Sequence, residues 1–124
     1  MARNILISFL GTSNYLETYY SLGDYKSTQP VRFIQEALIE HIAKDWTSKD
    51  KILIFCTKLS LEKNWYDKGQ GNTESEGLFT RLKKLNLPIQ IEAVEISEGF
   101  TEADIWDIFN KVYHKIEKDD NIYL

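Results

Sequence analysis

Four short apolar runs, separated by longer segments with helical periodicity, constrain the fold of this chain more than any other feature. They cover residues 5–10, 51–56, 89–96 and 121–124. The first two are almost continuously apolar, as is typical of strands buried on both faces of a sheet. Strands that alternate with helices indicate parallel pairing through right-handed crossovers. The sequence therefore predicts an α/β fold, a Rossmann-like three-layer sandwich with a mainly parallel sheet.

Three segments between these runs have apolar side chains at the spacing of amphipathic helices. The first begins near Pro30, a residue that suits the first turn of a helix, and its periodicity continues to Trp46. Thr73-x-x-Glu76 resembles a capping box, so it predicts the start of the second helix. Thr101 is predicted to cap the third helix.

The two remaining segments are irregular. Residues 15–26 are rich in aromatic side chains and contain a Gly23-Asp24 turn, so we expect a small hairpin or an extended excursion there. Residues 57–73 form a polar stretch that is long for a connector, and long loops in compact domains are usually functional or mobile. Because the sequence contains neither an internal repeat nor a domain linker, residues 1–124 are expected to form a single domain.

Composition excludes several classes of protein. The 124 residues carry a formal net charge of −4, which argues against general nucleic-acid binding through bulk positive charge. Residues 1–73 hold nine basic and eight acidic side chains, whereas residues 74–124 hold six and eleven, so an anionic ligand would favour the first half. No run approaches the roughly 18 apolar residues of a membrane span. One cysteine cannot form an intramolecular disulfide, so we expect a cytoplasmic protein.

Ligands of such sheets bind beyond the carboxyl ends of the strands, which directs attention to the residues after the first strand. These are Gly11, Thr12, Ser13 and Asn14. Glycine allows a close approach of the backbone to a ligand, and the polar side chains can hydrogen-bond phosphate oxygens or a ribose. Successive N–H groups can form an anion-binding nest. A plain polar turn is the alternative interpretation.

The segment after the second strand contains Thr57, Lys58, Asn64 and Trp65. A lysine at the carboxyl end of a strand can meet a phosphate as a point charge. An aromatic ring in this segment can stack on a base. The alternative is a solvated loop whose aromatic residues cover the edge of the core.

Neither a catalytic centre nor a metal or cofactor site is predicted. His41 and His114 fall on different helices, and neither has a further ligand nearby at zinc-site spacing. Cys56 at the end of a predicted strand is interpreted as a small buried hydrophobic residue rather than a nucleophile. The sequence contains neither a G-x-G-x-x-G fingerprint nor a P-loop.

Residues 5–15, Ile-Leu-Ile-Ser-Phe-Leu-Gly-Thr-Ser-Asn-Tyr, resemble the first strand and loop of CRISPR-associated Rossmann-fold (CARF) proteins. More narrowly, the chain is similar to the type III CRISPR accessory proteins whose later signature is Asp-x-Thr-His-Gly. Residues 33–38, 52–57 and 64–65 are similar to the same group. That signature would follow a strand such as residues 121–124, where the chain stops, so the resemblance implies an incomplete CARF domain.

The resemblance implies a sensor that binds cyclic oligoadenylate, the second messenger of type III CRISPR antiviral defence, as a tetra- or hexa-adenylate. CARF domains usually dimerise and hold this ligand across the two-fold axis. The first loop, Thr12, Ser13 and Asn14, would contact phosphate or ribose. The second loop would cover the ligand through Thr57, Lys58, Asn64 and Trp65. Neither a membrane nor a nucleic acid is an expected direct partner of this segment.

Family effectors carry a HEPN ribonuclease domain, which this sequence lacks, so the sensor would regulate an attached or associated ribonuclease. Two alternatives stay open. A few CARF domains cleave the cyclic ligand themselves, and Ser13 and Lys58 are the first candidates for that ring-nuclease activity. The other alternative is a structural or interaction fragment without a ligand.

Overall fold

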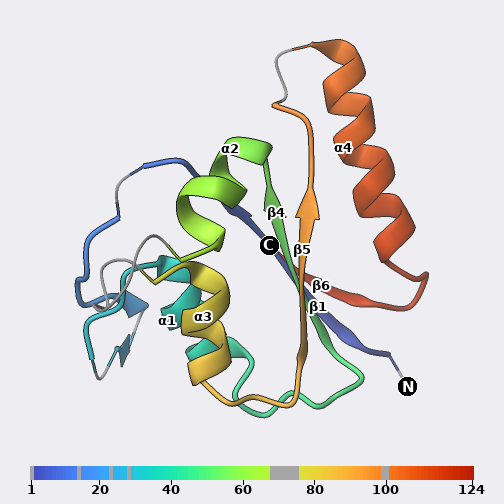
Figure 1. Ribbon diagram of the computed structural model, residues 1–124. Helices are drawn as coiled ribbons and strands as arrows, with labels where there is room; N and C mark the ends of the chain where they lie inside the picture. Colours follow the sequence, from blue (N-terminus) through green and yellow to red (C-terminus); the bar gives the residue numbers. More distant parts are fainter. Residues whose placement is uncertain (1, 14, 23, 28, 68–75, 99–100) are drawn as a thin grey trace.

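A four-stranded parallel sheet in the order β5-β4-β1-β6 organises the protein (Figure 1). The computed structural model describes residues 2–13, 15–22, 24–27, 29–67, 76–98 and 101–124. The strands are β1 (Asn4–Leu10), β4 (Lys51–Cys56), β5 (Gln90–Glu95) and β6 (Asn121–Tyr123). Helices connect them, which confirms the α/β, Rossmann-like class predicted from the alternation of strands and helices.

The two central strands end at the same level of the sheet. Leu10 is the register partner of Cys56, the last residue of β4, so the loops after β1 and β4 leave neighbouring positions. Ile52, Leu53 and Ile54 are completely buried, which is why this strand is a continuous apolar run rather than an alternating one.

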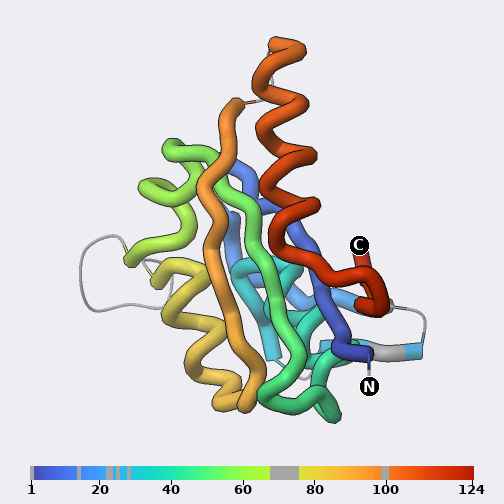
Figure 2. The backbone as a smooth tube through the Cα atoms, turned by 90° about the vertical axis from the view of Figure 1, so that its right-hand side faces the viewer, coloured from blue at the N-terminus to red at the C-terminus, as the bar shows by residue number. Residues whose placement is uncertain are grey.

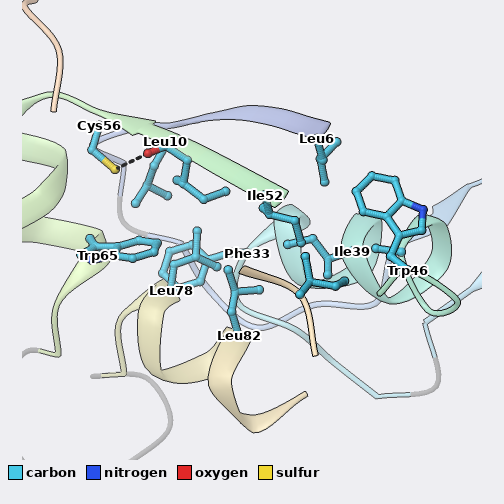
Figure 3. Packing of buried hydrophobic residues seen from close by; sticks show 13 residues of the cluster. Leu6, Leu10, Phe33, Ile39, Trp46, Ile52, Cys56, Trp65, Leu78 and Leu82 are labelled. Carbon is cyan, nitrogen blue, oxygen red and sulfur yellow. Dashed lines mark hydrogen bonds between the residues drawn. The ribbon is translucent and has the colours of Figure 1, made fainter. Parts of the chain in front are cut away.

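Alternate strand residues pack into two apolar clusters, one on each face of the sheet. One cluster contains Ile52 and receives side chains from α1 (Ile34–Ile42) and α3 (Leu78–Lys84) (Figure 3). The other contains Leu53 and is covered by α4 (Glu102–Lys115). Figures 1 and 2 accordingly place α4 on the opposite side of the sheet from α1 and α3. Helices therefore cover both faces.

The first helix is shorter than its periodicity predicts. It begins at Ile34 rather than near Pro30, because Val31 pairs with Thr18 in an antiparallel bridge that holds the preceding backbone extended. The helix ends at Ile42, so the prediction that it continues to Trp46 is also wrong. Trp46 is nevertheless buried, because the chain turns back and the indole packs against the ring of Tyr123 at 5.3 Å.

The second helix begins later than the capping-box prediction. Thr73 lies outside the described residues, and α3 starts at Leu78 with Gly77 as its N-cap. A Cβ atom on Gly77 would lie 2.1 Å from the carbonyl oxygen of Trp65, so this close approach of two backbones requires glycine and sets the entry into α3. The cap at Thr101 is confirmed, because its hydroxyl accepts a hydrogen bond from the backbone N–H of Asp104.

The irregular segments are partly ordered. The expected hairpin is present as β2 (Ser21–Leu22) and β3 (Tyr25–Lys26), an antiparallel pair of two residues each. The polar stretch after β4 differs from the predicted loop, because it begins with α2 (Lys58–Ser60) and the π-helical turn η1 (Leu61–Trp65). None of the helices in the described ranges has the length and apolar character that a membrane crossing requires.

Candidate functional site

The carboxyl ends of β1 and β4 bring most of the predicted ligand residues to one edge of the sheet. Gly11, Thr12 and Ser13 follow β1 and are exposed. Thr57, which is partly exposed, and Lys58, which is exposed, follow β4. Asn14 lies outside the described residues. Thr12, Ser13 and Lys58 are therefore exposed residues that follow the ends of neighbouring strands.

Thr57 and Lys58 have different roles at this edge of the sheet. The Thr57 hydroxyl accepts a hydrogen bond from the Ser60 N–H at 3.1 Å and so caps α2. The Lys58 ammonium forms no ion pair within the part of the chain that the structure describes. Lys58 is therefore not committed to an ion pair among the described residues, whereas the Thr57 hydroxyl stabilises the local backbone.

Asn64 joins the two loops from inside the protein. It lies on η1 and has no exposed surface. Its Nδ2 donates hydrogen bonds to the carbonyl oxygen of Gly11 at 2.7 Å and to that of Ser13 at 3.1 Å. The amide side chain thus contacts the first loop directly, and a ligand outside the protein would meet the loop before it met Asn64.

The Oδ1 atom of Asn64 is buried and accepts no hydrogen bond within the described residues. Turning the amide over would place Oδ1 against two carbonyl oxygens, so the orientation with Nδ2 toward the loop is the favourable one. A buried acceptor without a partner costs about 1–3 kcal/mol. π-Helical turns are frequent at functional sites, and a buried acceptor without a partner needs a specific explanation.

Trp65 is part of the core. Its side chain is 4% exposed, and its ring packs against that of Phe79 at 5.4 Å in an edge-to-face arrangement. Figure 3 shows it beside Leu78 in the cluster under α3. The ring therefore presents no open face on which a base could stack. The next residue, Tyr66, is 57% exposed and does present one.

A third strand contributes residues that the sequence analysis did not select. A pocket of about 470 Å³ lies beyond β4 and β5, with Lys58, Ser97 and Lys111 in its lining. Lys111 donates a hydrogen bond to the carbonyl oxygen of Glu95 at 2.7 Å, and the Ser97 hydroxyl lies 3.1 Å from a carboxylate oxygen of Asp107. The carboxyl-end rule, applied to β5, would have selected Ser97. Lys111 lines the pocket only because α4 packs beside β5, and no pattern in the sequence predicts that position.

The lining of this pocket is not positively charged overall. Its other members include the carboxylates of Glu95, Glu98 and Asp104, which outnumber the two lysines. Lys58 itself belongs to this lining, whereas Gly11, Thr12 and Ser13 carry no carboxylate, so the first loop is the better place for a phosphate group.

A buried ion pair holds the helices that support the first loop. Glu36 of α1 accepts a hydrogen bond from Arg81 of α3 at 2.7 Å, and Arg81 also pairs with Glu17 at 3.0 Å. Burial lowers the pKa of Arg81, but its hydrogen bonds to Glu36 and Glu17 outweigh burial and raise the pKa above its ordinary value. Arg32 extends the network by donating to the carbonyl oxygen of Tyr15 at 3.1 Å. These contacts connect the end of the first loop to both helices.

The structure also bears on the other reactive residues. Cys56 is buried, and its desolvation raises the pKa of the thiol to about 11, so it is not a thiolate near neutral pH. The described residues contain no cluster of three or more side chains suited to holding a metal ion.

No family model matches the sequence, and neither does any curated protein.

Proposed function

We propose that the carboxyl edge of the sheet binds cyclic oligoadenylate and that the protein is a sensor of type III CRISPR antiviral defence in the cytoplasm. One observation carries the proposal: the exposed residues Thr12 and Ser13 follow β1 and the exposed Lys58 follows β4, so polar loops leave the carboxyl ends of two neighbouring parallel strands. The identity of the ligand comes from the resemblance of the first strand and loop to CARF proteins.

The chemistry of this edge is consistent with such a ligand. Hydroxyl groups both donate and accept hydrogen bonds, so Thr12 and Ser13 can meet phosphate oxygens as well as ribose hydroxyls. Lys58 supplies a single point charge rather than a basic patch. That suits a small ring whose few phosphates are distributed over a two-fold site, and the exposed ring of Tyr66 can stack on an adenine.

The proposal includes a homodimer, for which an exposed apolar face of α4 is the candidate interface. Trp106, Phe109 and Tyr113 are 62%, 61% and 73% exposed and line one hollow together with Val112 and Ile116. These side chains present roughly 300–500 Å², about half of what a standard interface takes from each partner.

The experiment is a calorimetric titration of the 124-residue chain with cyclic tetra-adenylate and cyclic hexa-adenylate, followed by chromatography of the products. Saturable binding with recovery of intact ligand is the expected result. Recovery of linear di-adenylate would instead assign ring-nuclease activity. Absence of binding to both rings by a chain with a folded circular-dichroism spectrum would overturn the proposal and favour a structural fragment.

A further inference from the structure

We infer that Asn64 is the positioning residue of the first loop: it turns the loop carbonyls inward, so that a backbone N–H faces an anionic ligand. This inference rests on the proposed function, because it concerns how the same edge of the sheet binds a phosphate group. Its own basis is the pair of hydrogen bonds from Asn64 Nδ2 to the carbonyl oxygens of Gly11 and Ser13.

The direction of the Thr12 N–H follows from the geometry of the peptide bond. The peptide between Gly11 and Thr12 is trans, like all others in the described chain, so its C=O and N–H point in opposite directions. The Gly11 carbonyl points to the buried side chain of Asn64. The Thr12 N–H therefore points away from the core, and it donates to no acceptor within the described residues. A donor in this position is suited to a phosphate oxygen.

Tyr15 also contacts the first loop. A Cβ atom on Gly11 would lie 2.5 Å from the Tyr15 hydroxyl, so a side chain at position 11 would require that hydroxyl to move. The Tyr15 ring is in turn fixed by an edge-to-face contact with Phe33 at 5.4 Å. Asn64 and Tyr15 together leave the loop little freedom. Binding of a ligand then requires less loss of conformational entropy.

The π-helical turn η1 determines the direction in which the Asn64 side chain points. The Tyr66 N–H bonds to the Leu61 carbonyl, and this wider turn brings Asn64 to the inner side of η1, where Trp65 is also buried. The arrangement leaves Asn64 Oδ1 without a partner among the described residues. An apolar side chain at position 64 would avoid that unpaired acceptor. The hydrogen bonds to the loop carbonyls therefore explain an asparagine at this position better than core packing does.

The test compares Asn64→Asp with Leu82→Ala, a buried substitution on α3 that leaves the loop carbonyls untouched. Asn64→Asp replaces the donor by an oxygen of similar shape, and it is expected to weaken binding of cyclic tetra-adenylate at least about tenfold. Leu82→Ala is expected to lower the melting temperature but to leave the affinity within about threefold. Equal affinities for Asn64→Asp and the wild type would overturn the inference.

Two further readouts separate positioning from a merely structural role. A protonated carboxyl group in the Asn64→Asp variant can donate again, so lowering the pH from about 7.5 to about 5.5 should partly restore its binding but not change the wild type. In the ligand-free protein, Asn64→Leu should shift the NMR amide resonances of Thr12 and Ser13, whereas Leu82→Ala should not. If the wild type binds neither ring, the proposed function fails, and the amide resonances still decide the role of Asn64: unchanged Thr12 and Ser13 signals refute it.

Discussion

The ion pair between Glu36 and Arg81 allows a sharp test of how the candidate site is supported. The two side chains are only 6% and 10% exposed, and Glu36 also accepts hydrogen bonds from the backbone N–H groups of Arg32 and Phe33. Glu36→Gln retains an oxygen for those N–H groups but places an NH₂ group against the guanidinium. Removing one partner of a buried pair costs about 3–5 kcal/mol. Because Glu17 still pairs with Arg81, we expect about 3 kcal/mol.

The assay is urea unfolding followed by circular dichroism, with thermal unfolding as a second measurement. A loss of about 3 kcal/mol corresponds to a fall of roughly 10–15 °C in the melting temperature of a chain of this size. Glu117→Gln is the matched control, since Glu117 is 74% exposed in its bridge to Arg3 and should contribute little. The double variant Glu36→Gln with Arg81→Met removes both charges and should recover most of the lost stability. If Glu36→Gln were no more destabilising than Glu117→Gln, the inference of a desolvated pair would be refuted.

The remaining predictions concern binding, assembly and pH. Thr12→Ala with Ser13→Ala should weaken binding of cyclic tetra-adenylate, measured by calorimetry, by at most about 3–6 kcal/mol. The melting temperature should stay nearly unchanged because both side chains are exposed. Unchanged affinity would remove the first loop from the site. Trp106→Glu should convert the proposed dimer to a monomer in size-exclusion chromatography with light scattering, and a wild type that is already monomeric would contradict the proposed interface. Burial acts to raise the pKa of Asp50, but hydrogen bonds from two backbone N–H groups outweigh it and hold the pKa below its ordinary value. The stability that Asp50 contributes should therefore be present above about pH 4 and be lost as the pH falls through its folded-state pKa. Asp50→Asn should flatten this acid dependence of the free energy of unfolding, measured by urea unfolding. An equally steep profile in the variant would refute the assignment.

Much of the fold could be predicted because its signals are local. The runs at residues 5–10 and 51–56 are apolar on both faces, and only a strand covered from both sides of a sheet requires that pattern. The cap at Thr101 likewise depends on a residue three positions away. The same rules placed Thr12, Ser13 and Lys58 at the carboxyl edge, because the ends of adjacent parallel strands lie together.

The errors lie where distant contacts override local preference. Pro30 is an acceptable helix start, but the bridge between Thr18 and Val31 keeps the chain extended there. The segment after β4 contains polar residues typical of a loop, and its π-helical turn forms around the burial of Trp65 against Phe79. No pattern within a few residues reports either contact, because each joins segments distant in sequence.

The sequence by itself therefore determined the order of strands and helices, the parallel sheet and the edge at which Thr12, Ser13 and Lys58 lie, because hydrophobic periodicity and strand polarity are properties of short segments. Tertiary structure alone decided what each residue at that edge does. Asn64 and Trp65 are adjacent polar and aromatic residues in a loop-like stretch, and packing buries both: one hydrogen-bonds the first loop, and the other joins the core. Burial and hydrogen-bond partners depend on the whole fold, so only the three-dimensional arrangement separates a residue that would touch a ligand from one that holds the loop in place.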